Sequence, residues 1–366
     1  MKRNCVRLFA GIMTVIMAVS TLLALSACDR REWEEKYDTS LPSLLEKDGW
    51  RITLSDEFNK FSSIEDVYEK TCWRPSPHGK RKEEYWCDQM IDFDKEIGAV
   101  VIRTERKNNH VCDVCDVNEG IFTGGIETAS KEGHSNRRIF EQAYGYFEAE
   151  VKVPTAPGMW SAFWLQSYSV GKIGNKGRDG TEIDIYESSF SRRNKTKTGN
   201  ALHWDAYDSV YYKYVDHVTD VGINLYDGLL HTYSLLWTPN YYVFYVDRKP
   251  VWATDAGGVS TVKEYLRLTV EVRDGKIGPY GQSLGKYENA SDGSTDFYIS
   301  RVSVWQNAEY EENICSNESY VDMKSTYDKA VAASVATGVF IALAIILLFV
   351  LIIKRCYAVN KFNKNN

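Results

Sequence analysis

Hydrophobic and polar residues alternate in many short stretches through the middle of the chain, between about residues 50 and 306. Alternation with a period of two, together with β-branched and aromatic residues, is typical of half-buried β-strands. Turn-forming residues separate the stretches, for example at 155–158 and 255–258. The pattern predicts an all-β domain, an antiparallel sandwich, with one short helix at 262–265. The expected strands are 51–54, 100–103, 146–153, 161–165, 181–186, 231–237, 242–246, 266–272 and 297–305.

An apolar segment opens the chain. Residues 1–28 begin with a basic flank, continue through an apolar run and end in small residues, which are the three parts of a secretory signal. The last four, Leu25-Ser26-Ala27-Cys28, resemble a bacterial lipobox, in which removal of the signal leaves Cys28 as a lipid-bearing N-terminus. Ordinary cleavage near Ala27 and an uncleaved signal anchor are the alternatives, because the apolar run is nearly long enough to span a bilayer. Residues 29–49 are then a linker.

A second apolar segment lies near the other end, at 330–353, and is long enough to cross about 30 Å of hydrocarbon as a transmembrane helix. The tail behind it, 354–366, is rich in Lys and Arg, a bias typical of the cytoplasmic side of a membrane. The middle of the chain is therefore expected outside the cell, held in membrane lipid by this helix and, in the lipobox interpretation, by an N-terminal lipid. The polar residues 307–329 lack strand alternation and are expected to form an extracellular stalk.

Charge and aromatic content narrow the class of partner. The formal net charge of −6 is spread along the chain rather than gathered in a basic stripe, so nucleic acid is not an expected partner. The 10 Trp and 24 Tyr exceed what a core usually needs. Rings with an apolar face and a polar tip suit half-exposed surfaces, and sugar rings are one natural partner for them.

Five cysteines fall in the part expected outside the cell. They are Cys72, Cys87, Cys112, Cys115 and Cys315. A hairpin with its turn at 95–98 would bring the first four together near its open end. In an oxidising compartment these four are expected to form two disulfides; a four-thiolate zinc site is the alternative, which a single Cys-x-x-Cys supports only weakly. Cys315 is left as an unpaired thiol in the stalk.

The segment 179–187 places three carboxylates among β-forming residues. Residues two apart share a face of a strand, so Glu182 and Asp184 point together while the isoleucines between them point into the core. Glu187 lies at an odd offset and would fall on the wrong face of a regular strand. One extra residue, a β-bulge near Ile185 or Tyr186, would return Glu187 to the face of the other two acids.

Glycoside hydrolysis with retention of configuration needs such a cluster. One carboxylate attacks the sugar, and a protonated carboxylic acid about 5–5.5 Å away supplies a proton. Like-charge repulsion and partial burial raise the pKa of one of the two acids into the useful range, and a third acid can share a proton with the nucleophile. An exposed strand face of solvated acids is the alternative. The aromatic neighbours in sequence favour the chemistry; they are Trp160, Phe163, Trp164, His203, Trp204, Tyr207 and Tyr211.

These motifs resemble glycoside hydrolase family 16, the group of laminarinases, lichenases and agarases. Residues 50–59 resemble the opening strand of that family, and 144–149 with 158–165 resemble its central strands. Glu182-Ile183-Asp184-Ile185-Tyr186-Glu187 matches the catalytic signature of the bulged branch. Further matching segments follow in family order at 201–204, 231–239 and 245–247.

The resemblance covers residues 50–306, which are expected to form the catalytic domain. It implies a concave jelly-roll β-sandwich of the concanavalin A-like lectin/glucanase type. It also implies Glu182 as nucleophile, Asp184 as its helper and Glu187 as acid/base. Substrate-binding residues implied by the resemblance are Trp160, Trp164, His203, Trp204, Glu84, Tyr85 and Trp86.

The chain departs from the family pattern at three places. Glu150 stands where the family usually has Arg, so a local charge pair is lost or rebuilt. Ser300 replaces an Asp that in many members helps to hold a structural calcium; this argues against calcium, and no cofactor is expected. The region 72–115 has no family counterpart and is expected to reshape the cleft.

The function expected from these observations is endo-acting cleavage of a β-linked glucan, β-1,3 or mixed β-1,3/1,4, at the surface of a bacterial cell by double displacement. A transglycosylase with the same chemistry is one alternative. A surface protein that binds glycans without cleaving them is another, because fold does not decide function.

Overall fold

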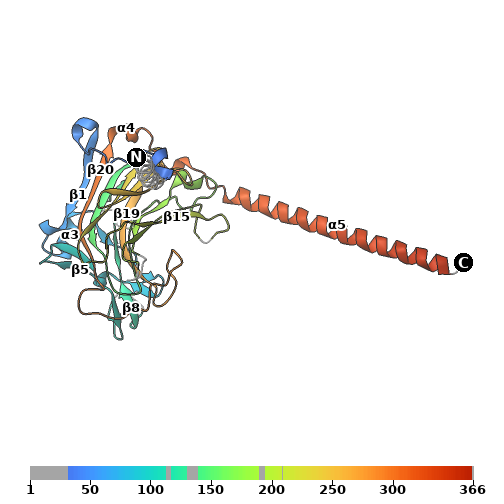
Figure 1. Cartoon of the computed structure of the whole chain (residues 1–366), viewed down its shortest axis with the longest axis horizontal. Helices are drawn as coiled ribbons and strands as arrows, with labels where there is room; N and C mark the ends of the chain where they lie inside the picture. The colour runs from blue at the N-terminus through green and yellow to red at the C-terminus, as the bar shows by residue number, and fades with distance from the viewer. Residues whose placement is uncertain (1–31, 113–116, 130–138, 189–193, 208, 365–366) are drawn as a thin grey trace, which may run out of the picture.

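A computed structural model of the chain describes residues 32–112, 117–129, 139–188, 194–207 and 209–364. Two eight-stranded antiparallel sheets form the main body (Figure 1). The first sheet contains β1 (Trp50–Glu57), β5 (Ile91–Asp94), β6 (Ala99–Ile102), β11 (Gly145–Lys152), β16 (His231–Trp237), β17 (Tyr242–Val246), β18 (Lys249–Thr254) and β20 (Phe297–Asn307). The second contains β2 (Arg74–Pro75), β9 (Gly125–Glu127), β10 (Glu141–Gln142), β12 (Met159–Gln166), β13 (Glu182–Glu187), β14 (Lys197–Trp204), β15 (Lys213–Asp220) and β19 (Glu264–Val272).

The two sheets pack face to face around one shared core, because alternate residues of each strand point inward. Phe147 and Leu235 of the first sheet belong to the same buried cluster as Phe163 and Ile183 of the second. Tyr186 and Tyr233 stack across the interface with ring centroids 3.9 Å apart. An aromatic pair of this kind contributes about 0.5–1.5 kcal/mol beyond the area that it buries. The predicted all-β sandwich is confirmed.

A third, four-stranded sheet extends from the main body (Figure 1). It consists of β3 (Gly79–Lys80), β4 (Glu84–Trp86), β7 (Glu105–Lys107) and β8 (Gly120–Thr123), of which β4 and β8 run parallel. Among the described residues, its own buried cluster consists of Cys87, Met90 and Phe122, with Tyr85, Cys112 and Val117 packed against it. This sheet, with the turn between β3 and β4 and the short helix η3 (Asp88–Met90) that leads from β4 to β5, is called the arm below.

Helices are few in the described part of the chain. They are α2 (Glu32–Lys36), α3 (Ile64–Lys70), α4 (Ala308–Glu311) and α5 (Lys324–Lys364), with the 3₁₀ turns η1 (Glu46–Asp48), η2 (Phe58–Lys60), η3, η4 (Lys176–Asp179) and η5 (Asn317–Ser319). The helix expected at 262–265 is wrong, because Glu264 already begins strand β19. Strands β14, β15 and β18 escaped prediction; β15 is an edge strand with mostly exposed side chains and therefore lacks a clear apolar alternation.

The segment expected to be a polar stalk packs against the domain instead of hanging free. The backbone N–H of Met323 donates to the carbonyl of Ile173 at 3.0 Å, and the ammonium of Lys172 donates to the carbonyl of Tyr320 at 2.8 Å. At the start of α5 the Tyr211 hydroxyl donates to Asp328 at 2.9 Å. Residues 313–328 thus follow the domain surface up to the first turns of α5.

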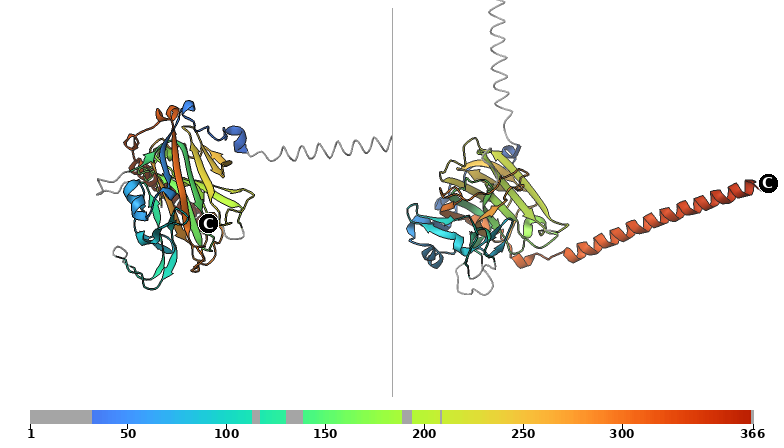
Figure 2. Two further views of the ribbon diagram at one scale, coloured as in Figure 1. Left: turned by 90° about the vertical axis from the view of Figure 1, so that its left-hand side faces the viewer. Right: turned by 90° about the horizontal axis from the view of Figure 1, so that it is seen from below.

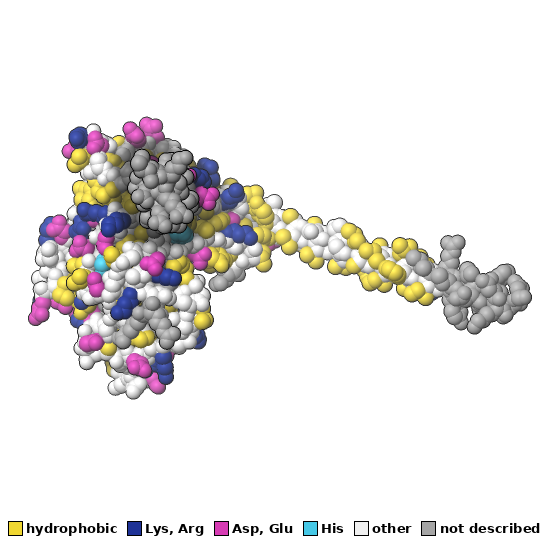
Figure 3. All heavy atoms as spheres, in the orientation of Figure 1, with side chains coloured by type: hydrophobic (Ala, Val, Ile, Leu, Met, Phe, Trp, Pro, Cys, Tyr) yellow, Lys and Arg dark blue, Asp and Glu magenta, His cyan; other side chains and the backbone are white. Residues whose placement is uncertain are grey.

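Helix α5 leaves the domain as one straight rod, as the view from below makes clear (Figure 2). The described apolar side chains of this helix between Val331 and Ile353 are exposed, whereas the domain surface mixes both signs of charge (Figure 3). It is the one helix in the described residues that is long and apolar enough to cross a membrane. The helix includes the whole of the predicted span 330–353.

The charge pair that Glu150 puts in question is rebuilt in the first sheet. Arg301 lies 3.5 Å from Glu150 and 3.0 Å from the buried Glu148. Arg248 makes a second contact with Glu148 at 3.1 Å. On the first sheet, Arg301 therefore forms ion pairs with both Glu148 and Glu150, and Arg248 forms a further ion pair with Glu148.

Candidate active site

Strand β13 carries a β-bulge. On the side of β12, Asp184 pairs with Trp164 and Tyr186 pairs with Phe163, so two steps along β13 correspond to one along β12. On the side of β14, the three steps from Asp184 to Glu187 correspond to two. One extra residue therefore lies at Ile185, and the predicted bulge is confirmed.

The bulge sorts the side chains of β13 between the core and a cleft. Ile183, Ile185 and Tyr186 belong to the buried core. Glu182, Asp184 and Glu187 all line one cleft of about 630 Å³ on the outer face of the second sheet. The other lining residues are Arg81, Lys82, Trp160, Trp164, Gln166, Ala201, His203, Tyr207, Tyr212, Tyr214, Asp216, Arg267, Pro279 and Tyr280. Three acids thus meet in a cavity rich in aromatic rings.

Glu187 is held by two donors from outside β13. The indole N–H of Trp160 donates to Oε1 at 2.7 Å, and the Tyr280 hydroxyl donates to Oε2. Burial, followed by the negative charge of Asp184, raises the pKa of Glu187 to about 8, although these donors oppose the shift. A carboxyl group with this pKa keeps its proton at neutral pH and can deliver it.

Glu182 has different partners. The Tyr207 hydroxyl donates to its Oε2 at 2.5 Å, and Nε2 of His203 lies 3.9 Å from its Oε1. Burial and Asp184 raise the pKa of Glu182 to about 7, while His203 and Tyr207 act in the opposite direction. His203 therefore favours the ionised form of Glu182.

His203 is the charge partner of Asp184. Its Nε2 lies 3.1 Å from Oδ2 of Asp184, and its Nδ1 forms a hydrogen bond with the Tyr212 hydroxyl. Burial lowers the pKa of His203, but the hydrogen bond and the negative charge of Asp184, together with the two glutamates, raise it to about 9. A protonated imidazole thus stands among three acids. Ligand atoms of Glu182, Asp184 and His203 lie within 4.8 Å of one another and could also hold a cation.

Several residues implied as substrate contacts lie elsewhere. Trp160, Trp164 and His203 line the cleft as expected. Trp204 is not among the described lining residues; it follows His203 on β14, so it points to the opposite face and packs on the main core cluster and against Gly257.

The expected outer subsite at 84–86 is wrong for at least two of its three residues. Glu84 is fully buried, and its carboxylate accepts the backbone N–H groups of Glu83 at 3.0 Å and Val272 at 2.9 Å. Trp86 is 2% exposed and donates to the carbonyl of Val270 at 2.8 Å. Tyr85 is half-buried against Phe122 and does not line the cleft. Strand β4 uses these side chains to attach the arm to β19.

The arm contributes two basic residues that the sequence did not single out. Arg81 pairs with Glu271 at 3.0 Å, and its guanidinium lies 4.4 Å above the Trp86 ring. The Lys82 ammonium lies 5.7 Å above the Trp160 ring. Tyr280 was missed as well, because it reaches the cleft from an irregular loop between β19 and β20 whose only sequence signal is its flanking Gly-Pro and Gly.

The structure describes only part of the predicted cysteine cluster. Sγ of Cys87 and Sγ of Cys112 lie 3.3 Å apart, so these two are brought together as expected. Cys115 and the lipidation candidate Cys28 lie outside the described residues. Cys72 and Cys315 are both half-buried.

Comparison with known proteins agrees with this geometry. Residues 100–270 match the sequence model for "Glycosyl hydrolases family 16". A β-glucanase of Fibrobacter succinogenes is 33% identical over 144 residues, which cover 38% of this chain and 38% of that protein. The chain thus matches well under two thirds of that relative.

Solved structures share the fold. One, from work on endo-acting O-glycanases of human gut bacteria that initiate mucin breakdown, has a TM-score of 0.54 at 21% identity and covers 75% of this chain and 95% of its own. The catalytic domain of an endo-1,3-β-glucanase (laminarinase) from Thermotoga petrophila has a TM-score of 0.52 at 20% identity, covering 71% and 99%. At this identity the likeness concerns the fold of the sandwich.

Proposed function

We propose that this chain, which matches the model for glycosyl hydrolases of family 16 over residues 100–270, is a retaining, endo-acting glycosidase of that family that cleaves a β-linked glucan at a membrane surface. The observation that carries the proposal is the bulge at Ile185, which turns Glu182, Asp184 and Glu187 into one cleft. A solvated acidic face would not be enclosed by Trp160, Tyr207 and Tyr280 in hydrogen-bonding contact with its acids.

The two glutamates take different roles because their partners differ. Glu187, with a pKa raised to about 8, donates its proton to the glycosidic oxygen as the bond to the leaving sugar breaks. Glu182 attacks the anomeric carbon and forms a glycosyl ester. Glu187, now ionised, then removes a proton from water, whose oxygen displaces Glu182 and restores the starting state.

Asp184 and His203 adjust the charge around this exchange. The Asp184 carboxylate lies 3.1 Å from the ring of His203, so its charge is partly neutralised. His203 in turn lies close enough to Glu182 to favour its ionised form. Tyr207 occupies Oε2 of Glu182 and leaves Oε1 available for attack. This division of contacts supports Glu182 rather than Glu187 as the nucleophile.

The substrate class rests on the cleft and on the relatives. Trp160, Tyr212 and Tyr214 offer apolar faces with polar edges, which suit pyranose rings. A relative matched by sequence is a β-glucanase, and the solved structures that share the fold include a laminarinase and one from work on mucin O-glycanases. We therefore place a β-1,3 or mixed β-1,3/1,4 glucan first among the substrates.

The proposed location follows from α5. The hydrogen bond from Tyr211 to Asp328 lies only two residues before the apolar segment that begins at Ala330, so a membrane around that segment would lie directly beside the domain. The basic tail behind the segment favours the cytoplasmic side, which leaves the cleft outside. Protease added to intact cells should then release the domain; release only after lysis would contradict this orientation.

The activity can be tested with the full chain in detergent on laminarin, mixed-linkage glucan, cellulose and a β-galactan. We expect oligosaccharides of several lengths from at least one β-glucan, and none from Glu187→Gln. Tight binding to a glycan without any product would identify a binding protein instead. Longer products that form only with an added sugar acceptor would identify a transglycosylase.

A further inference from the structure

The arm has too little apolar interior to hold itself together. Its four strands contain two to four residues each, and among the described residues its buried cluster consists of Cys87, Met90 and Phe122. Small units with a core of this size generally depend on a disulfide or a metal ion. Yet the arm must be fixed in place, since it brings Arg81 and Lys82 to the cleft.

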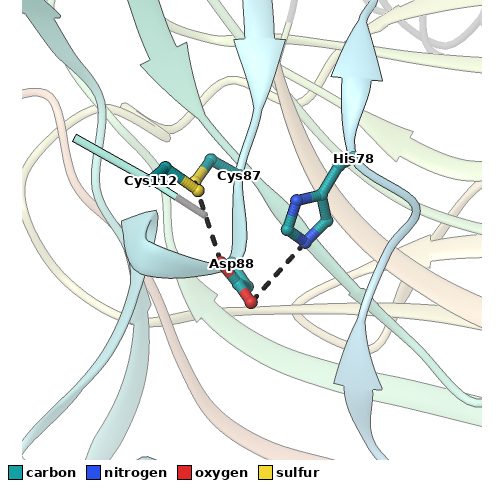
Figure 4. Close-up of side chains that lie close together, drawn as sticks. All are labelled: His78, Cys87, Asp88 and Cys112. Carbon is teal, nitrogen blue, oxygen red and sulfur yellow. Dashed lines mark hydrogen bonds and ion pairs between the residues drawn. The ribbon is translucent and has the colours of Figure 1, made fainter. Parts of the chain in front are cut away.

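Four side chains that can bind a metal converge at the centre of the arm (Figure 4). His78 precedes β3, Cys87 and Asp88 lie where β4 ends and η3 begins, and Cys112 comes from the segment between β7 and β8. Their ligand atoms all lie within 4.8 Å of one another. Three chain segments distant in sequence therefore meet at one point.

Three contacts within this group have the length of an edge of a tetrahedron around one zinc ion, and every separation lies within 4.8 Å. Bonds of about 2.0–2.3 Å place neighbouring ligand atoms of a tetrahedral ion about 3.3–3.8 Å apart. The two sulfurs are 3.3 Å apart, Sγ of Cys87 lies 3.7 Å from Oδ1 of Asp88, and Nε2 of His78 lies 3.6 Å from Oδ2 of the same carboxylate. A disulfide would need sulfurs about 2.05 Å apart and would give the histidine and the aspartate no part.

The surroundings of His78 support the same conclusion. Its Nδ1 is buried and has no hydrogen-bond partner among the described residues. The contact of Nε2 with Asp88 makes Nε2 the ring nitrogen placed to bind the ion. Met90 and Phe122 pack beside the sulfurs, so a thiolate there would need a divalent cation to neutralise its charge.

We propose that the arm holds one structural zinc ion, bound by His78, Cys87, Cys112 and Asp88. Two sulfurs with a nitrogen and an oxygen give four ligands, among the described residues, of the kinds that zinc accepts. The ion ties the segments on either side of β4 to the loop between β7 and β8. It thereby fixes the arm, and with it Arg81 and Lys82 beside the cleft.

The test uses the full chain, purified in detergent without chelators or added reductant. Metal content by mass spectrometry should give one zinc per chain beyond any ion in the cleft, and differential alkylation should show Cys87 and Cys112 unbridged. Cys112→Ser and His78→Ala should each lose this zinc, whereas Asp88→Asn should bind it about 10–100-fold more weakly. Cys315→Ser, which removes a cysteine outside the arm, should keep it.

A bridge between Cys87 and Cys112 in a zinc-free chain would overturn the proposal, as would zinc that survives both Cys112→Ser and His78→Ala. If those variants fail to fold, the unaltered chain still decides the question. Replacement of its zinc by cobalt should produce visible absorption of a tetrahedral site and a sulfur-to-cobalt charge-transfer band. Cobalt bound without the sulfur band would contradict the assigned ligands.

Discussion

Strand β13 and the arm line the same cleft but are fixed by different means. β13 lies between β12 and β14 in an eight-stranded sheet, and its inward residues pack in the main core. The arm is a four-stranded sheet with a small apolar cluster of its own, attached through β4. The acids on β13 are therefore held by the fold itself, while the basic residues of the arm depend on local cross-links. Changes on β13 should abolish the chemistry, and changes on the arm should alter how substrate is held.

The largest effect is expected from Glu182→Gln. Without a carboxylate nucleophile, kcat should fall by at least about 10⁴-fold, although the sheet and the cleft remain intact. Initial rates on the best glucan and the circular dichroism spectrum check this. Glu119→Gln, an exposed position in the arm, is the matched control and should keep full activity. A loss below tenfold in Glu182→Gln would remove Glu182 from the reaction.

Glu187→Gln should be the next most damaging change. The loss of the acid should reduce kcat/KM for glucans by about 10²–10⁴-fold but spare kcat/KM for activated aryl glycosides, because a good leaving group needs little protonation in the first step. Equal losses on both substrates would exclude the acid role.

The pH profile sharpens this assignment. Glu182 must be ionised, so activity should fall as the pH drops below about 7; Glu187 must be protonated, so activity should fall as the pH rises above about 8. Because the two groups interact, these limits belong to the pair. The profile of kcat/KM should therefore be bell-shaped, and Glu187→Gln should lose its alkaline limb on aryl glycosides. An alkaline limb that persists would assign it to another group.

Tyr280→Phe should have a smaller and more specific effect. The hydroxyl donates to Glu187 and favours its ionised form, so its removal should raise the pKa of Glu187 further. The alkaline limb should move to higher pH, with kcat at its optimum changed by less than about tenfold. Tyr85→Phe, on the arm and away from the cleft, is the control. A shift toward lower pH would contradict the hydrogen bond.

The smallest effect is expected on the arm itself. Lys82→Ala should raise KM for long glucans by about two- to tenfold and leave kcat unchanged, because the ammonium lies above Trp160 and touches no acid of β13. Lys80→Ala, whose ammonium lies over Tyr85 instead, should change neither constant. A fall in kcat with unchanged KM in Lys82→Ala would show that the arm takes part in the chemical step, as β13 does, and would contradict the difference in roles proposed for the two regions.

The comparison of β13 with the arm also explains which residues of the site could be predicted from the sequence. Strand parity predicted that Glu182 and Asp184 share a face, and the odd offset of Glu187 predicted the bulge at Ile185. The resemblance put Trp204 in the cleft, whereas strand alternation with His203 places it on the opposite face, where the structure has it. Glu84 and Trp86 could not be assigned, because the sheet that buries them brings together strands far apart in the chain. Tyr280 could not be assigned to the cleft either, because it lies in an irregular loop and hydrophobic periodicity predicts only helices and strands.

The account rests on Glu182 as a covalent nucleophile, and the stereochemistry of the product tests it most directly. Retention requires two carboxyl groups about 5–5.5 Å apart, which leaves no room for water on the far face of the sugar, so the bond is broken in two displacements. When hydrolysis of the best glucan is followed by proton NMR, the new reducing end should appear first as the β-anomer and only later equilibrate. An α-anomer that appears first would mean inversion by a single displacement and would contradict the assignment of Glu182.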